Sequence, residues 1–429
     1  MSHCAVLEAV AGCVPPQVIT NHDLPAEWDV NDAWVRGRTG IATRHRAGAG
    51  VSTSDLAVEA GRRVLRSAGN PVVDLVIVAT STPDRPCPAT APAVATRLGL
   101  SGVAAYDISA VCTGFIYGLA TAQGFIASGV ATRILLIGAD VWSTLLDPDD
   151  RSSGVVFGDG AGAVLLRAGA AGEKGALLGF DLGSDGSGED LITVRAGGSR
   201  ARSDAEPLPE RESRFSMTGR EVFRRAVAAM AASATTTLRK VGWQAEQLDR
   251  LVPHQANARI LTAVARCLDL PADRVVGNIE HVGNTGAASI PLALADAVAH
   301  HGLVPGDRVL LTAFGGGLTW GSAALTWPDL PPVDHVKIYN HRSTTMQTVN
   351  DRMMFLLTDN FGIPAEDIRP NVSFDELDVD SLTLAELAII LGKEFGVEVS
   401  DDDISKKLTP VEAAALIQAK VAGSTPSAT

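Results

Sequence analysis

The chain has 429 residues, of which 46% are hydrophobic, and a formal net charge of −13. This length suits two or three domains, and there is enough apolar material for a large core. The acidic balance argues against nucleic-acid binding, and no apolar run reaches the roughly eighteen uncharged residues that a membrane span needs. The first sixteen residues contain Glu8 and no basic start, so we expect no signal peptide and a cytoplasmic protein.

Apolar β-branched runs and helical patterns alternate in the first three quarters of the chain. The same order occurs twice, with similar spacing, at 74–80, 110–119 and 133–139 and again at 248–252, 283–292 and 307–313. Such alternation is typical of an α/β fold with buried sheets. We therefore predict a domain over 1–328 with two similar halves, about 1–170 and 171–328. Strand ends and helix N-termini of the two halves should meet at a shared centre.

A different pattern follows. Residues 329–344 are rich in proline and polar residues and are predicted to form a linker. Residues 345–421 have apolar residues at helical spacing, and Thr409-Pro410 is typical of a helix start, which predicts a small all-α bundle of four helices. Residues 343–429 carry 15 acids and 6 bases, so this module should meet basic partner surfaces. Residues 422–429 are expected to be a disordered tail.

The five cysteines are scattered and odd in number, and none has metal-ligand spacing, so neither a disulfide framework nor a metal site is predicted: Cys4, Cys13, Cys87, Cys112 and Cys267. Cys112 stands out because it begins an apolar helix. The positive end of the helix dipole favours a thiolate nucleophile there. The alternative for an isolated cysteine is a packed core residue.

Three further positions are candidates for chemistry. His254 follows the strand 248–252, Asn284 lies between glycines, and Phe314 precedes a glycine run that ends the strand 307–313. A histidine at a strand end suits catalysis, and the glycine run can offer a backbone N–H to an oxyanion. Each also has an ordinary structural interpretation, for the asparagine a simple turn. Near the end of the chain, Ser381 sits between an acidic stretch and an apolar helical pattern.

Together these motifs resemble a known family. Residues 1 to about 328 resemble the β-ketoacyl carrier-protein synthase III enzymes, through seven motifs in family order: Trp34 with 38–41, 112–115, 147–151, 157–163, 254–257, 284–289 and 315–321. The resemblance implies a thiolase-like, duplicated αβαβα layered fold. Residues 345–421 resemble an acyl carrier protein. That resemblance implies 4′-phosphopantetheine on Ser381, attached by a phosphopantetheinyl transferase.

The resemblance also implies roles for individual residues. Cys112 would be the acyl-accepting nucleophile, His254 and Asn284 the pair that assists decarboxylation, and the N–H groups of Cys112 and Gly316 the oxyanion hole. Trp34, Arg38 and Arg151 would bind coenzyme A. Arg259 would dock the carrier protein. Cys87 and Phe314 would line the acyl pocket. An ordinary solvated charge is the alternative for Arg259. Cys87 stands where relatives carry a bulkier residue reaching across a dimer interface.

The sequence thus predicts an acyltransferase that performs decarboxylative Claisen condensation of an acyl-CoA primer with malonyl-acyl carrier protein, in polyketide or fatty-acid synthesis. A homodimer is expected, and the carrier can be the chain's own or a free one. Three alternatives remain open: acyl transfer through Cys112 without condensation, a cysteine hydrolase, and a docking module whose serine is never modified. Asn284 favours condensation over transfer, because a carboxylate there would repel an enolate.

Overall fold

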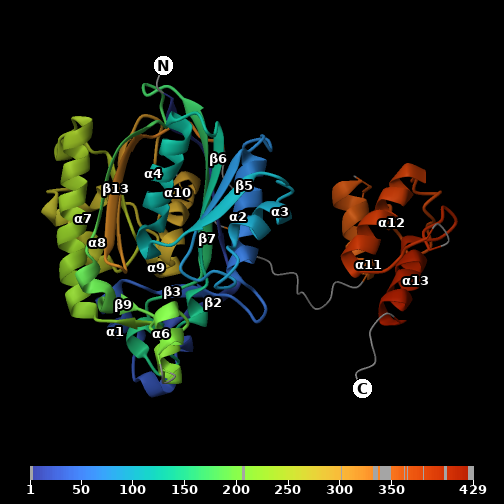
Figure 1. Ribbon diagram of the computed structural model, residues 1–429, viewed down its shortest axis with the longest axis horizontal. Helices are drawn as coiled ribbons and strands as arrows, with labels where there is room; N and C mark the ends of the chain where they lie inside the picture. The colour runs from blue at the N-terminus through green and yellow to red at the C-terminus, as the bar shows by residue number, and fades with distance from the viewer. Residues whose placement is uncertain are drawn as a thin grey trace. The chain divides into compact units, whose positions relative to one another are not determined.

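The computed structural model describes residues 3–204, 208–300, 302–331, 337–338, 349–361, 363–364, 366–379, 381–400 and 403–423. The chain forms two compact units, Met1–Asn340 and His341–Thr429 (Figure 1). Most of the predicted linker and the tail from 424 onward lie outside the described residues. Within the described part, no helix is long and apolar enough to cross a membrane.

Two sheets make up the centre of the larger unit. The first has the order β14-β1-β7-β6-β4-β5 and the second the order β11-β12-β13-β8. The strands of the first are β1 (Cys4–Val14), β4 (Leu75–Ala79), β5 (Ala104–Ile108), β6 (Arg133–Asp140), β7 (Gly160–Gly169) and β14 (Lys337–Ile338); those of the second are β8 (Leu177–Ser184), β11 (Arg250–Pro253), β12 (Arg308–Gly315) and β13 (Thr319–Thr326).

The predicted internal duplication is visible in the strand order. The order β1-β7-β6-β4 in the first sheet recurs as β8-β13-β12-β11 in the second. In each sheet two parallel strands, β4 with β6 and β11 with β12, are followed by antiparallel pairs. β14 adds two residues of the predicted linker to the edge of β1, opposite Cys13 and Val14.

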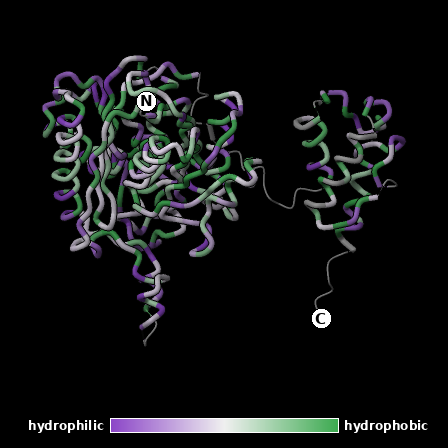
Figure 2. Tube along the Cα trace, turned by 45° about the horizontal axis from the view of Figure 1, so that its top comes forward, coloured by the Kyte–Doolittle hydropathy of each residue, from purple (hydrophilic) through white to green (hydrophobic). Residues whose placement is uncertain are grey.

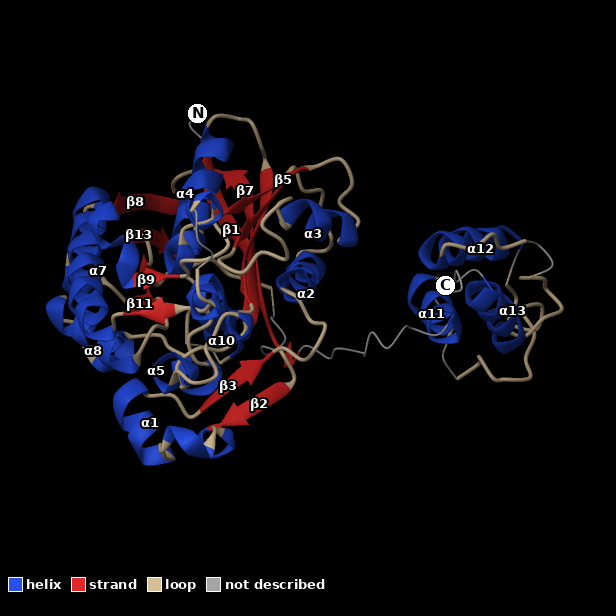
Figure 3. Ribbon diagram, turned by 60° about the horizontal axis from the view of Figure 1, so that its bottom comes forward, coloured by secondary structure: helices blue, strands red, loops and turns tan. Residues whose placement is uncertain are grey.

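Helices cover both sheets and fill the space between them, which confirms the layered αβαβα fold (Figures 1 and 3). On the outer face of the first sheet lie α2 (Thr53–Ser67) and α3 (Ala91–Arg97), and on that of the second α7 (Gly219–Val241) and α8 (Ala258–Cys267). Between the sheets lie α4 (Gly114–Ala127) and α10 (Ser289–Ala299). In Figure 2, α7 alternates hydrophilic and hydrophobic segments, as expected of a helix with one buried face.

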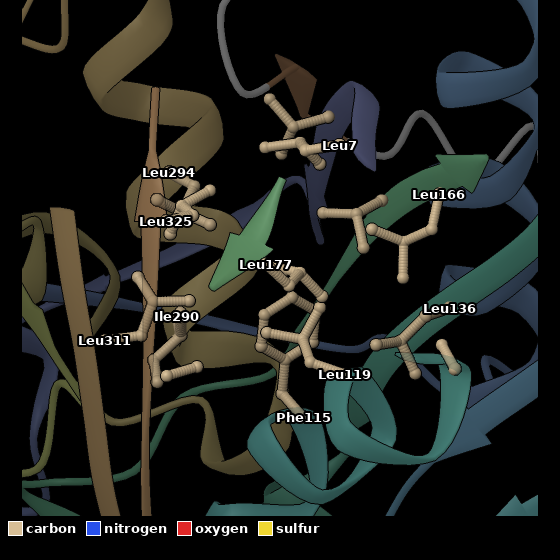
Figure 4. Packing of buried hydrophobic residues seen from close by; sticks show 14 of the residues in the cluster. Leu7, Phe115, Leu119, Leu136, Leu166, Leu177, Ile290, Leu294, Leu311 and Leu325 are labelled. Atoms are coloured by element: carbon tan, nitrogen blue, oxygen red, sulfur yellow. The ribbon is translucent and has the colours of Figure 1, made fainter. Parts of the chain in front are cut away.

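The central core forms where α4 and α10 pack between the sheets (Figure 4). Its side chains come from both sheets and from both of these helices, and they include Leu7, Phe115, Leu119, Leu136, Leu166, Leu177, Ile290, Leu294, Leu311 and Leu325. Glycine lets α4 approach the sheet closely. A Cβ on Gly118 would lie 2.5 Å from Cδ1 of Leu136, so a larger residue there would push α4 away from β6.

Shorter elements form the side of this unit below the sheets in Figure 1. They are β2 (Gln17–Thr20), α1 (Asp32–Thr39), β3 (Thr43–Arg46), α5 (Arg151–Gly154), β9 (Ile192–Thr193), α6 (Ser199–Ser203), β10 (Ser216–Met217) and α9 (Ile279–Val282). The N-cap Asn31 starts α1 by accepting the N–H of Trp34 at 2.8 Å. This contact sets the position of Trp34 beside the cavity described below.

The smaller unit is helical, as predicted. It contains α11 (Val349–Phe355), a π-helical continuation (Leu356–Asn360), α12 (Ser381–Phe395) and α13 (Pro410–Gly423) around a core that includes Met353, Phe374, Leu387, Leu391 and Ile417. Thr409 and Glu412 form a capping box at the start of α13, with Thr409 N–H to Glu412 Oε2 at 2.9 Å. Residues 422 and 423 belong to α13 and not to the predicted tail, because the helix continues to Gly423.

Candidate active site

A cavity of about 350 Å³ opens between the two halves of the larger unit. Its walls are largely apolar, and they bring together Cys112, His254 and Asn284, which are far apart in the sequence. Elements from both halves meet there: Cys112 precedes α4, His254 follows β11, and Asn284 precedes α10 (Figure 3). Such a pocket, largely apolar with a few convergent polar groups, is typical of a small-molecule site.

Cys112 lies in a 3₁₀ turn, Val111–Thr113, one step before α4 begins at Gly114. The sequence placed it on the helix itself. Val111 has a φ of 47°, which is the left-handed region that β-branched residues rarely adopt. The turn presents both Val111 and Cys112 to the cavity. Strain of this kind persists only where the surrounding structure enforces it.

The thiol of Cys112 is buried and is not a free thiolate. Burial raises its pKa, the nearby Asp140 carboxylate raises it further, and a hydrogen bond from the residue's own N–H lowers it. The sequence predicted a lowered pKa from the helix N-terminus; desolvation outweighs that effect in the folded protein. The thiol is therefore protonated, and it would need a base or a substrate to take its proton before it could act as a nucleophile.

His254 is held at the end of β11 in a buried position. Its backbone N–H donates to Thr312 O at 2.8 Å, and its Nδ1 lies 2.6 Å from Ser289 Oγ. Burial lowers the pKa of His254 to about 3, so the imidazole is neutral at pH 7. A neutral imidazole in this place can donate one hydrogen bond from its other nitrogen, Nε2.

Asn284 is fixed from two sides. Its N–H donates to Val156 O at 2.9 Å and its carbonyl accepts the N–H of Gly158 at 3.0 Å, so its backbone follows the segment at 156–158. Its side-chain Oδ1 accepts the N–H of Gly286 at 3.0 Å. Because the oxygen is engaged by the backbone, the Nδ2 amide group is left to donate toward the cavity.

Asp140 anchors the segment that follows Asn284, a role that the sequence analysis did not identify. The carboxylate is fully buried at the end of β6 and accepts the N–H of Ala287 at 2.8 Å and that of Ser81 at 2.7 Å. Burial raises its pKa to about 6 despite these bonds. The sequence signal for this role was a single acidic residue at the end of an apolar strand. A carboxylate buried at such a position is expected to accept hydrogen bonds from backbone N–H groups.

The glycine run after β12 approaches Cys112 closely. A Cβ on Gly315 would lie only 2.8 Å from the backbone nitrogen of Cys112, so a side chain there would collide with the turn that holds Cys112. Phe314 lines the cavity. Gly316 follows directly and packs against Ile192, with its Cβ position 3.0 Å from Ile192 O.

Trp34, Arg38 and Arg151 form one cluster beside the cavity. Cζ of Arg38 lies 4.2 Å and Cζ of Arg151 5.6 Å from the centroid of the Trp34 ring. Trp34 and Arg38 line the cavity, and both arginines are exposed. A ring flanked by guanidinium groups suits a ligand that carries a flat base and phosphates.

Arg259 and Cys87 lie outside the cavity. Arg259 lines a separate shallow groove together with Arg36, Arg266 and Phe223, and donates to Gly37 O at 2.6 Å. Cys87 is exposed in this single chain and is not among the described residues that line the cavity. Its predicted place in an acyl pocket depends on a second subunit.

Most of the apolar wall was not identified from the sequence. It includes seven residues from five separate segments: Trp142, Val156, Ile192, Phe215, Met217, Ala226 and Met230. In the sequence these residues resemble ordinary core positions, since they are apolar residues in helices, strands and turns. Only the packing of the two halves turns them toward one space.

We predict that Val111→Ala changes the choice of primer. The substitution removes a branched side chain from the cavity wall and lessens the backbone strain at this position. One methylene in an apolar pocket is worth about 10- to 200-fold in discrimination. The rate of Cys112 acylation with a primer one or two carbons longer should therefore rise about tenfold relative to the rate with acetyl-CoA. Intact mass spectrometry measures both rates.

Val72→Ala, on the surface, is the control for this substitution. An unchanged ratio of the two acylation rates in Val111→Ala would contradict the placement of Val111 in the primer pocket.

In the smaller unit, Ser381 is the first residue of α12. The N-terminus of a helix favours a phosphate group through its free N–H groups and dipole. Exposed Asp375, Glu376 and Asp378 precede this position. The local structure therefore fits a phosphodiester link at the predicted attachment residue.

Comparison with protein families gives three matches. Residues 106–186 match 3-oxoacyl-[acyl-carrier-protein] synthase III, residues 238–327 match its C-terminal domain, and residues 351–417 match the phosphopantetheine attachment site. The first two matches include Cys112, His254 and Asn284, and the third includes Ser381.

Individual relatives agree with these matches. A β-ketoacyl-[acyl-carrier-protein] synthase III of Streptomyces coelicolor is 56% identical over 77% of this chain and 99% of its own length. The crystal structure of the Pseudomonas aeruginosa enzyme is 52% identical, with a TM-score of 0.71 over 76% of this chain and 99% of that one. The priming β-ketosynthase of the R1128 polyketide pathway is 31% identical, with a TM-score of 0.71 over 77% and 98%. The chain belongs to the β-ketoacyl-[acyl-carrier-protein] synthase III family, acyltransferases that perform the initiating Claisen condensation, and it also carries a phosphopantetheine attachment domain.

Proposed function

We propose that this chain condenses an acyl-CoA primer with a malonyl group carried by an acyl carrier protein. The primer acylates the Sγ of Cys112, and coenzyme A leaves with the thiol proton. The malonyl thioester then loses CO₂, and the resulting enolate carbon attacks the acyl group on Cys112. A β-ketoacyl thioester is released, and the Cys112 thiol is restored by taking up a proton.

The observation that carries this proposal is the neutral pair of donors beside the nucleophile. Decarboxylation leaves a negative oxygen on the malonyl thioester, which must be stabilised. His254 Nε2 and Asn284 Nδ2 can both donate to it without carrying a charge, and both line the cavity that contains Cys112. We assign the two residues this role.

The other assignments follow the geometry around the cavity. The N–H groups of Cys112 and Gly316 would hold the oxyanion of the tetrahedral intermediates, a role supported by the close approach of the glycine run to the Cys112 backbone. Trp34, Arg38 and Arg151 would bind the nucleotide end of coenzyme A. Phe314, and Cys87 from the second subunit of a homodimer, would shape the acyl pocket.

Arg259 and its neighbour Arg266 are assigned to carrier docking. Both line the basic groove beside the cavity, and acidic side chains are the natural partners of such a groove. Arg36 in the same groove is already paired with Asp32 and Glu280. The exposed acids before Ser381 give the chain's own carrier domain the matching charge.

Ser381 is the proposed attachment residue for 4′-phosphopantetheine, whose thiol holds a malonyl or acyl group as a thioester. A phosphopantetheinyl transferase would attach it from coenzyme A, in the cytoplasm. The runner-up function is acyl transfer from Cys112 to another nucleophile without condensation. Asn284 weighs against it, because that reaction has no enolate oxygen to stabilise.

One experiment tests the modification and the reaction together. The purified chain is treated with coenzyme A and a phosphopantetheinyl transferase, then offered an acyl-CoA primer and a labelled malonyl group. We expect a mass gain in wild type and in Ser405→Ala, none in Ser381→Ala, and release of labelled CO₂ with β-ketoacyl product. An unmodified wild-type chain would support a docking role for the carrier domain. Acyl transfer without CO₂ would establish the runner-up.

A further inference from the structure

A buried hydroxyl touches the proposed catalytic histidine from outside the cavity. Ser289 is the first residue of α10, is 1% exposed and is not among the described residues that line the cavity. Its Oγ lies 2.6 Å from Nδ1 of His254, a contact between residues 35 positions apart. Nothing in the reaction described above uses this residue.

The direction of that hydrogen bond follows from the other partner of the hydroxyl. The backbone N–H of Gln255 points to Ser289 Oγ at 3.3 Å, so the oxygen already accepts one hydrogen bond. The hydroxyl proton is then free to donate to Nδ1 of His254. In the opposite arrangement Nδ1–H would donate to Oγ, and among the described contacts the buried hydroxyl proton would have no acceptor. Such an unpaired group is costly.

The direction of the bond decides the tautomer of the imidazole. His254 is buried and neutral, so its ring carries one N–H. If Nδ1 accepts from Ser289, the proton must lie on Nε2, which is the nitrogen left for the substrate. The other tautomer would place a lone pair at Nε2, and a lone pair repels an enolate oxygen.

We propose that Ser289 is a positioning residue that fixes His254 as the Nε2–H tautomer, so that it can donate to the enolate. This inference rests on the proposed function of His254. It gives a role in the reaction to Ser289, to which neither the reaction described above nor the family motifs assign one.

The position of Ser289 in the chain supports the proposal. Residues 284–289 form one short buried segment, with Asn284 at its start and Ser289 at its end. Within it, Gly286 N–H orients the Asn284 amide, and Asp140 holds the N–H of Ala287. One anchored turn thus aligns both donors, Asn284 directly and His254 through Ser289.

The tautomer can be measured without any activity assay. The chain contains nine histidines, so uniform ¹⁵N-histidine labelling gives a small set of signals, and His254→Gln assigns that of His254 by its loss. In wild type we expect ¹⁵N shifts of a neutral Nε2–H imidazole that stay unchanged from pH 8 to pH 6. A wild-type Nδ1–H tautomer would overturn the proposal, whatever the variants do.

Two variants then connect the tautomer to the reaction. In Ser289→Ala we expect a mixture of tautomers and an about 10- to 100-fold slower CO₂ release, which is less than the 10²- to 10³-fold loss for removing a donor outright. Ser289→Thr keeps the hydroxyl and should restore most of the rate. Acylation of Cys112 by acyl-CoA should stay within about threefold in both, because no described hydrogen bond joins the thiol to the imidazole.

The outcomes separate this inference from the proposed function. If Ser289→Ala leaves both the tautomer and CO₂ release unchanged, Ser289 is not a positioning residue. If His254→Gln releases CO₂ at the wild-type rate, the proposed function of His254 fails, and the ¹⁵N shifts still decide what Ser289 does to the ring. Equal losses of CO₂ release and Cys112 acylation in Ser289→Ala, with a lower Tm, would mean a merely structural role and overturn the inference.

Discussion

Cys112→Ala is expected to abolish condensation while CO₂ release from the malonyl thioester continues. Without the thiol, no primer can be bound covalently, so formation of β-ketoacyl product should fall by on the order of 10⁴-fold or more. The proposed enolate donors, His254 and Asn284, line the same cavity and are unchanged by the substitution. Decarboxylation should therefore stay within about tenfold of wild type.

The measurement compares the acyl adduct, the CO₂ released and the β-ketoacyl product in the same sample. Cys267→Ala carries the same substitution at an exposed cysteine and serves as the matched control. It should acylate and condense normally. Acylation of the Cys112→Ala chain would show that the nucleophile lies elsewhere.

Asn284→Asp is expected to lose CO₂ release while acylation of Cys112 continues. The substitution keeps the shape and replaces a donor by a carboxylate, which repels the enolate oxygen. Loss of one such donor costs about 10²- to 10³-fold in rate, or about 2.7 to 4 kcal/mol. Acylation of Cys112 should continue, because the tetrahedral oxyanion of that step has other proposed donors.

The pH dependence of this variant provides a sharper test. A carboxyl group in this buried site should have a raised pKa, so it becomes protonated as the pH falls and can then donate. CO₂ release by Asn284→Asp should therefore increase as the pH is lowered from 8 to 5. His254 does not confuse the reading, because its pKa of about 3 keeps it neutral over that range. Asn70→Asp, at an exposed position, should show no such rise. If CO₂ release by Asn284→Asp instead falls as the pH is lowered, in parallel with that of Asn70→Asp, the assignment is contradicted.

The two variants together test the division of labour in the cavity. If Cys112→Ala loses acylation and condensation but keeps CO₂ release, and Asn284→Asp keeps acylation but loses CO₂ release and the condensation that depends on it, the thiol and the donor pair act in separate steps. Loss of both acylation and CO₂ release in either variant would mean that the two steps are coupled more tightly than the geometry indicates.

The sequence by itself determined the architecture and the main candidates. The apolar runs that became β4, β6, β11 and β12 repeat in the same order, because strands buried on both faces need continuous apolar residues. Cys112 and His254 stood out at the ends of apolar patterns, Asn284 by its neighbouring glycines, and Ser381 between an acidic stretch and an apolar helical pattern. The resemblance to a known family implied their roles.

Only the tertiary structure decided the environment of these residues. Whether Cys112 is a thiolate depends on desolvation and on Asp140, which is 28 positions away, and not on the helix that follows it. The left-handed φ of Val111, the apolar wall and the contact between Ser289 and His254 are likewise products of packing between distant segments. Local propensities set which elements form. A side chain's pKa, tautomer and exposure depend on what the folded chain places within a few ångströms of it, and no single segment contains that information.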